Sequence, residues 1–145
     1  MMLDSLTDEE KAAFASICRL TEHKAGDLIV TEKAPGDTLL IIRQGNAEVR
    51  KYIAGSSFRK LKELKPGDFF GEMSFLGRSP RSACVVATVP TEVLELREKD
   101  FTVLTKSYPA IGAKIYGTIA RELAGRLRRN NDELKKVLSL FIEQE

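Results

Sequence analysis

The segment FFGEMSFLGRSPRSACVVA, residues 69–87, joins a glycine, a short apolar run, a turn of small residues and a β-branched run. The apolar run is compatible with a helix or a strand. If Gly71 opens a single helical turn, the unpaired amides at its start form an anion site, and glycine lets a phosphate approach the backbone. Arg81 can then contact two phosphate oxygens with its planar guanidinium group.

Glu72 lies beside the same expected anion site and would repel a phosphate unless it had a hydrogen-bond donor of its own. A ribose 2′-hydroxyl supplies such a donor, so an acid for the sugar and an arginine for the phosphate suit a nucleotide. A second interpretation stays open from the residues alone, in which Glu72 and Arg81 form a surface ion pair with each other.

Around this segment, β-branched and aliphatic residues occur in short runs separated by turn signals, from Gly26 to about Arg97. Many short strands at this spacing are typical of an antiparallel sandwich or barrel. The Gly-Asp pairs at 26–27, 36–37 and 67–68 lie at the ends of runs, where glycine can take a positive φ and aspartate can close a turn. The predicted strands cover residues 27–31, 39–43, 47–53, 58–64, 82–88 and 92–96.

Helices are expected on both sides of this β region. Thr7 and Glu10 have the spacing of a capping box for an amphipathic helix over 7–20. A short helix is expected from 98 to 104, and Pro109 stands where an N1 proline would start a long one.

The long helix carries a stripe of residues spaced alternately by four and three positions, as in the seam of a coiled coil. As far as Leu123 the stripe can pack on the chain's own β-domain or on a partner, and both options are open. Beyond Leu127 the helix runs another ~20 Å, which favours self-association, and the basic residues there suit a solvated flank of a coiled coil better than nucleic-acid binding. The stripe comprises Tyr116, Ala120, Leu123, Leu127, Asn130, Leu134, Val137 and Phe141.

The composition is that of one soluble domain of 145 residues and argues against several kinds of site. His23, Cys18 and Cys84 have no metal-ligand spacing, so neither a metal site nor thiol chemistry is expected. The net charge of +2 gives no indication of nucleic-acid or membrane binding. No apolar run approaches the ~20 residues of a membrane span, and a signal peptide is not evident, so a cytoplasmic location is expected.

Residues 70–85 resemble the phosphate-binding cassette of the cyclic nucleotide-binding domains, as found in the catabolite activator protein family and in the regulatory subunits of cyclic AMP-dependent kinase. That cassette reads Phe-Gly-Glu-hydrophobic-Ala-hydrophobic, a short gap, and Pro-Arg-small-Ala-x-Val; here Ser74 replaces the usual alanine. The likeness extends through 36–42, 45–49 and 65–70 and covers nearly the whole chain. The matching residues are Phe70-Gly71-Glu72-Met73-Ser74-Phe75-Leu76 and Pro80-Arg81-Ser82-Ala83-Cys84-Val85.

The resemblance implies one mainly β domain over 1–145: an eight-stranded antiparallel β-roll at 26–97 with its cassette at 70–83, an N-terminal helix at 7–20, and helices at 98–142. It implies that Arg81 and backbone amides near Gly71, Glu72, Ser82 and Ala83 hold the cyclic phosphate, and that Glu72 and Gly71 hold the ribose. Members of the family cover the base with residues of the last helix. The residues implied for the base are Ser82, Arg126, Asn130 and Asn131.

We therefore expect a stand-alone, non-enzymatic sensor that binds cyclic AMP or cyclic GMP, the former preferred, and signals by moving its last helix. A homodimer through that helix and an unidentified protein effector are expected, without a cofactor, a metal, nucleic acid or a membrane. The chain ends without the helix-turn-helix of the activator family, and its first and last residues favour a complete chain over a fragment. A structural adaptor that has lost the nucleotide is the alternative, while a cupin-like enzyme is disfavoured by the single histidine.

Overall fold

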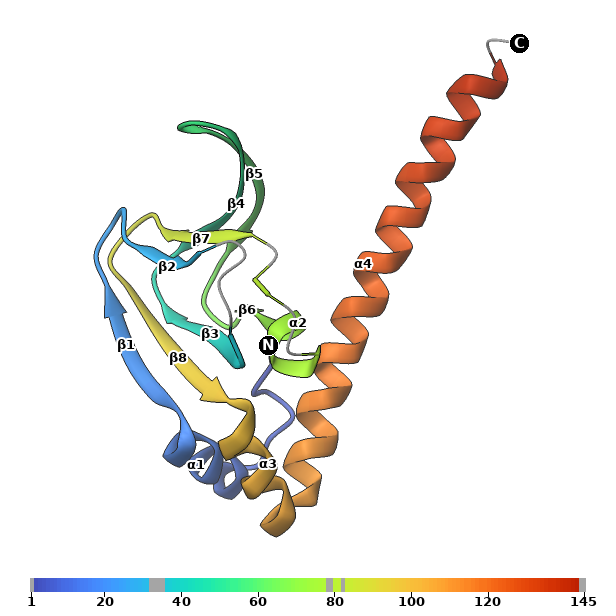
Figure 1. Ribbon diagram of the computed structural model, residues 1–145. Coiled ribbons are helices and arrows are strands. Elements are labelled where there is room, and N and C mark those ends of the chain that lie inside the picture. Colours follow the sequence, from blue (N-terminus) through green and yellow to red (C-terminus); the bar gives the residue numbers. More distant parts are fainter. Residues whose placement is uncertain (1, 32–35, 78–79, 82, 144–145) are drawn as a thin grey trace.

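A computed structural model of the chain describes residues 2–31, 36–77, 80–81 and 83–143, with side chains up to Phe141. The described part is mainly β, as the sequence predicts: eight strands form two antiparallel four-stranded sheets, ordered β1-β8-β3-β6 and β2-β7-β4-β5. One helix precedes the strands and a long helix stands beside them (Figure 1). The elements are α1 (Asp8–Ile17), β1 (Arg19–His23), β2 (Leu28–Val30), β3 (Thr38–Gln44), β4 (Ala47–Ala54), β5 (Ser57–Leu64), β6 (Phe69–Phe70), α2 (Glu72–Gly77), β7 (Cys84–Ala87), β8 (Thr91–Arg97), α3 (Glu98–Ser107) and α4 (Pro109–Glu143).

The N-terminal helix begins as predicted and ends earlier than predicted. The Thr7 side chain accepts a hydrogen bond from the amide of Glu10 at 3.2 Å, and Glu10 accepts one from the amide of Thr7 at 2.9 Å, which completes a capping box. The expected helix over 7–20 is wrong at its C-terminal end, because Cys18 is extended and β1 pairs with β8. The strands therefore begin at Arg19, before the predicted start of the β-roll at 26.

The short strand β6 was not predicted either, and it matters for the site. Phe69 and Phe70 pair with Ile41 and Leu40 of β3, so β6 delivers the chain to α2 from the first sheet. A run of two residues gives no alternation that a sequence pattern could detect.

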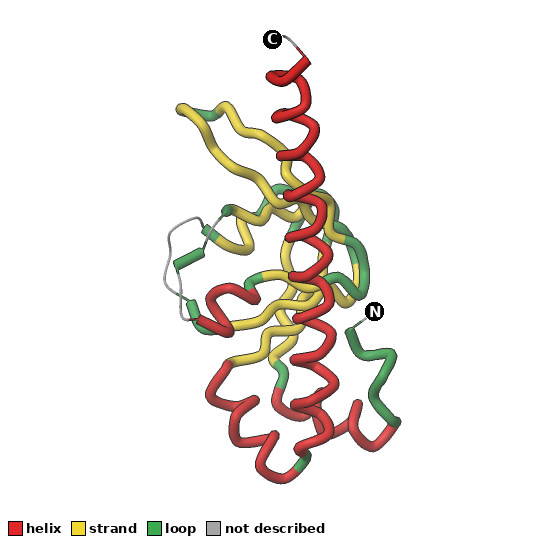
Figure 2. Tube along the Cα trace, turned by 90° about the vertical axis from the view of Figure 1, so that its right-hand side faces the viewer, coloured by secondary structure: helices red, strands yellow, loops and turns green. Residues whose placement is uncertain are grey.

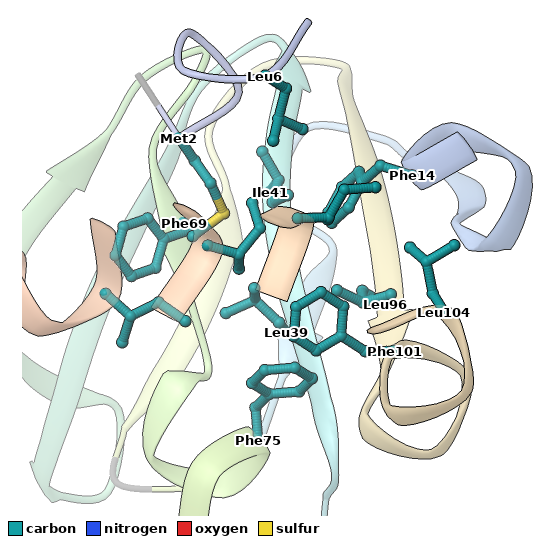
Figure 3. Close-up of a cluster of buried hydrophobic side chains, with 13 residues drawn as sticks. Met2, Leu6, Phe14, Leu39, Ile41, Phe69, Phe75, Leu96, Phe101 and Leu104 are labelled. Atoms are coloured by element: carbon teal, nitrogen blue, oxygen red, sulfur yellow. The ribbon is translucent and has the colours of Figure 1, made fainter. Parts of the chain in front are cut away.

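Three aromatic rings fix α2 to the helices around it. Phe75 of α2 lies 5.6 Å from Phe101 of α3, centroid to centroid, and Phe14 of α1 lies 6.5 Å from Phe101 in an edge-on arrangement. All three side chains are at most 1% exposed, and Figure 3 shows them together beside the first sheet. The single turn of helix that begins the cassette is thus anchored in the main core.

The long helix α4 has a buried first half and an exposed second half. Ile111, Ile115 and Ile119 are at most 1% exposed and belong to the main core, with Leu123 half-buried against it. The face that packs on the chain's own domain is therefore not the predicted stripe. Of the first stripe residues, Tyr116 is 43% exposed, although its ring lies 5.3 Å from that of Phe101, Ala120 is exposed, and Leu123 alone is half-buried against the core. Beyond Leu127 the apolar side chains are exposed, and Figures 1 and 2 show this half rising past the sheets.

Candidate functional site

A cavity of about 830 Å³ lies where the second sheet, the cassette and α4 meet. Its walls come from three parts of the chain that are far apart in sequence, which only the folded chain brings together. Among the described residues, the sheet contributes Val30, Val49, Lys51, Leu61, Lys62, Leu64 and Val85; the cassette and the strand leading to it contribute Phe69, Phe70, Gly71, Glu72, Met73, Ser74, Arg81 and Ala83; and α4 contributes Arg126, Arg129 and Asn130.

Gly71 turns the chain from β6 into α2. Its φ of +81° is in the left-handed region, and a Cβ there would lie 2.9 Å from the carbonyl oxygen of Thr38. The amide of Phe75 donates to the carbonyl of Gly71 at 3.1 Å and begins a helical turn, so of the helix and the strand that the sequence left open the structure forms the helix. Glu72, the first residue of that turn, is only 3% exposed.

Arg81 lies in the cavity wall and is fixed by backbone carbonyls. Its Nη1 donates to the carbonyl oxygens of Thr38 at 3.0 Å and Gly71 at 3.2 Å. Burial lowers the pKa of the Arg81 guanidinium, and the carboxylates of Asp37, Glu72 and Glu95 oppose that shift. An arginine remains protonated at neutral pH under such a shift, so the cavity wall carries a fixed positive charge.

Gly36 makes room for this guanidinium. A Cβ at Gly36 would lie 2.5 to 2.7 Å from the Nε, Cζ and Nη2 atoms of Arg81, which is closer than any side chain allows. From the sequence, all three Gly-Asp pairs are expected to form turns. Gly26 and Gly67 do have a positive φ, whereas Gly36 lies against the Arg81 guanidinium, which would have to shift if a Cβ were added there.

Glu72 is paired with Arg126 of α4. The Arg126 Nη1 donates to Glu72 Oε1, while Arg126 Nε lies 3.7 Å from Glu122 on the same helix. Lys62 and Arg129 also approach Glu122, at 3.5 and 3.8 Å. Within the described part of the chain, Glu72 is therefore partnered by α4, and the surface pair of Glu72 with Arg81 is not formed.

The structure brings most of the predicted binding residues to one cavity. Gly71, Glu72, Arg81, Ala83, Arg126 and Asn130 all line it. Asn131 is exposed and is not among the described lining residues. The expectations for Ser82, as a phosphate and a base contact, lie outside the described residues.

Sequence reasoning missed three cationic side chains of the cavity, Lys51, Lys62 and Arg129. Alternation along β4 is a signal for one of them, because Lys51 lies two residues after Val49 and therefore on the same face of the strand. Lys62 and Arg129 become neighbours only through their approach to Glu122, which no local pattern reports.

The charge of the lining suits an anion. Among the described residues it contains five cationic side chains and one carboxylate, and that carboxylate is buried and paired. Val30, Val49, Leu61 and Val85 give the same cavity an apolar wall. An anionic ligand that also has an apolar part matches this arrangement. None of the helices in the described chain combines the length and apolarity needed to cross a membrane.

Comparison with known proteins also indicates a site for an anionic ligand, and it identifies the family. A model of the cyclic nucleotide-binding domain family matches residues 20–108. The chain is 36% identical over 101 residues to a cAMP-dependent protein kinase regulatory subunit of Aspergillus fumigatus. The matched segment covers 69% of this chain and 24% of that protein. It is 30% identical over 142 residues to cGMP-dependent protein kinase, isozyme 1, of Drosophila melanogaster, covering 94% of this chain and 18% of that one.

The fold is similar to that in the crystal structure of Thermus thermophilus catabolite activator protein. The two superpose with a TM-score of 0.80 and 29% sequence identity over 94% of this chain and 62% of the other. The chain thus spans about a quarter or less of the two kinase relatives and less than two thirds of the activator protein.

Proposed function

We propose that this chain, which belongs to the cyclic nucleotide-binding domain family, binds cyclic AMP and acts as a regulatory sensor module. One observation carries the proposal: the buried carboxylate of Glu72 and the half-buried guanidinium of Arg81 lie in the wall of one cavity that α4 also lines. The two side chains offer an acceptor and a set of charge-assisted donors to one ligand, because they face the same cavity and are not paired with each other.

Arg81 would hold the cyclic phosphate. Its two carbonyl bonds occupy Nη1 and leave three of the five N–H donors of the guanidinium group for phosphate oxygens. The bonds to Thr38 and Gly71 also fix the group in place, so little side-chain entropy is lost on binding.

Glu72 would accept a hydrogen bond from the ribose 2′-hydroxyl, and this is where binding meets the signal. The same carboxylate is the partner of Arg126, so a ribose that reaches Glu72 must share it with α4 or displace the helix from it. A ligand moves an equilibrium only by binding two states with different affinity, and the Glu72–Arg126 contact provides such a difference. We infer that nucleotide binding shifts α4 relative to the cassette.

The base would lie between the apolar wall of the sheet and α4. Asn130 is the one neutral amide among the described lining residues, and an amide can give and accept a hydrogen bond with adenine. This is the reason for placing cyclic AMP before cyclic GMP.

The exposed half of α4 would pair with a second copy of the chain. Leu127, Leu134, Val137 and Phe141 are 49–67% exposed and keep the spacing of a coiled-coil seam, with no described part of the chain covering them. A homodimer through α4 would then carry the helix shift to an effector protein.

A calorimetric titration with cyclic AMP, cyclic GMP and 5′-AMP tests the proposal. Saturable binding of a cyclic nucleotide with no binding of 5′-AMP is the expected result, and the tighter of the two cyclic ligands identifies the base. A structural adaptor is the second candidate, because the Glu72–Arg126 pair satisfies the carboxylate without any ligand. Absence of heat with all three nucleotides would favour that adaptor.

A further inference from the structure

The hairpin of β4 and β5 ends in an exposed apolar tip. Ile53 is 74% exposed, Phe58 43% and Tyr52 38%, and Leu61 lower on the same hairpin is 51% exposed. Figures 1 and 2 both show this hairpin projecting from the molecule at the end away from α1 and α3. Exposed apolar side chains gathered in this way mark an interaction surface.

An aromatic pair and a neighbouring isoleucine make the hairpin tip apolar. Tyr52 and Phe58 are cross-strand partners whose rings lie 5.6 Å apart, so they share one face. Ile53 lies where the strand register is irregular, between the Tyr52–Phe58 and Ala54–Ser57 pairs, and it is the most exposed of the three tip residues.

The hairpin also carries more positive charge than the whole molecule. Residues 47–64 contain five basic and two acidic side chains, a net charge of +3, while the entire chain has +2. The two acidic residues, Glu48 and Glu63, lie away from the tip, where they approach Arg50 at 3.2 Å and Lys60 at 3.9 to 4.0 Å. The overall charge therefore conceals a local cationic surface beside the apolar tip.

We propose that the β4–β5 hairpin docks the protein on the surface of an anionic lipid membrane. Tyr52, Ile53 and Phe58 enter the interfacial region, and the basic side chains of the hairpin meet the lipid headgroups. Aromatic rings favour that region, and each basic group near an anionic leaflet adds to the attraction. The sequence argued against membrane binding on two grounds, the low net charge of the whole chain and the lack of an apolar run long enough to span a bilayer. Neither ground concerns a short projecting hairpin whose own charge is positive.

Two other occupants fit the hairpin less well. Nucleic-acid bases stack on open aromatic faces, but the Arg50 guanidinium lies over the Phe58 ring, 4.1 Å from its centroid. A second copy of α4 would bring residues 126–136, which have five basic and two acidic side chains, against a hairpin of like charge. Anionic lipid suits both the apolar and the cationic features of the tip.

Vesicle co-sedimentation tests the proposal. The full chain should bind phosphatidylcholine vesicles that contain about 30% phosphatidylserine. Its affinity for vesicles of phosphatidylcholine alone should be at least ~10-fold lower. Ile53→Asp should weaken binding to the anionic vesicles by at least ~10-fold, since it replaces the most exposed apolar group with a charge that anionic headgroups repel. Arg59→Glu should act in the same direction through charge alone.

Val103→Asp is the matched control, because Val103 is 61% exposed on α3, at the other end of the molecule. It should leave vesicle binding unchanged. The tip residues do not line the described cavity, so retained nucleotide affinity in the titration shows that the hairpin variants are folded.

Three results would overturn the proposal. The first is equal or absent binding to the two kinds of vesicle. The second is anionic binding that Ile53→Asp leaves intact. The third is a different partner for the tip: an oligonucleotide bound with Ile53-dependent affinity, or an Ile53-dependent change in sedimentation without lipid, which would assign the hairpin to nucleic acid or to a second copy.

Discussion

At the scale of single residues, Arg81 has two tasks that can be separated by experiment. It bonds the carbonyls of Thr38 and Gly71, and it would bind the cyclic phosphate. We expect Arg81→Ala to weaken cyclic nucleotide binding by about 3 kcal/mol, or more than ~100-fold, because a charge-assisted contact is lost. Isothermal titration calorimetry measures this loss.

Arg81→Lys keeps the charge and loses the planar fork, so it should fall between the wild type and Arg81→Ala. Arg19→Ala, on the exposed strand β1, is the control and should bind normally. An unchanged affinity in Arg81→Ala would remove Arg81 from the site, provided that thermal unfolding shows the variant to be folded.

The Glu72–Arg126 pair tests the link between the cassette and α4. Removing Arg126 leaves the carboxylate of Glu72, 4% exposed, without its cation, while the Arg126 side chain itself is 35% exposed. We therefore expect Glu72→Gln and Arg126→Gln to be coupled by about 1 kcal/mol in a double-mutant cycle on the free energy of unfolding. Urea denaturation supplies the four values.

Arg129→Gln is the matched comparison on the same helix. Its side chain is 64% exposed and reaches only Glu122, at 3.8 Å, among the described ion pairs. It should show no measurable coupling to Glu72. Equal couplings for Arg126 and Arg129 would mean that general charge on α4, and not the contact with Glu72, ties the helix to the cassette.

At the scale of elements, the join between α1 and α4 should respond to pH. Lys114 Nζ lies 2.5 Å from Glu10 Oε1, and this contact, with the bond from the Thr7 amide, holds the pKa of Glu10 below its ordinary value of 4.5. A lowered carboxyl pKa contributes stability that is present above the ordinary value and is lost as the pH falls through the folded value.

We expect the melting temperature to decrease as the pH is lowered from about 4.5. The decrease should be smaller in Lys114→Met, which lacks the cation that lowers the pKa of Glu10. Scanning calorimetry across this range measures both. Lys106→Met, on the exposed side of α3, should keep the wild-type profile. The same decrease in melting temperature in wild type and Lys114→Met would show that the Glu10–Lys114 pair does not contribute to stability.

The elements also show how far the sequence could be read. The capping box, the turn at Gly71 and the choice of Glu72 and Arg81 as candidate binding residues follow from local pattern, since each depends on spacings of a few residues. β1 and β6 depend on partners far along the chain, and nothing within Arg19–His23 or Phe69–Phe70 separates them from a helix end or a loop. The pairing of Arg126 with Glu72 is likewise a property of the folded chain, because 54 residues separate them.

At the scale of the whole molecule, the exposed half of α4 is the surface through which we expect the chain to dimerise. Leu134 is 56% exposed and Phe141 67% on a helix that runs beyond the sheets, so neither contributes to the core of one chain. Paired across a two-fold axis, the same residues would be buried against their copies. We expect a dimer in sedimentation velocity, and Leu134→Asp should convert it to a monomer.

The control for this last prediction lies more than one turn further along α4, between the seam positions Val137 and Phe141 and away from the seam. Ser139 is off the seam, so Ser139→Asp adds the same charge without entering the expected interface and should leave the dimer intact. The melting temperature at a concentration where wild type is monomeric should be the same for all three proteins, since Leu134 is outside the described core. A dimer that survives Leu134→Asp would place the contact elsewhere, and α4 would then carry the nucleotide signal within one chain.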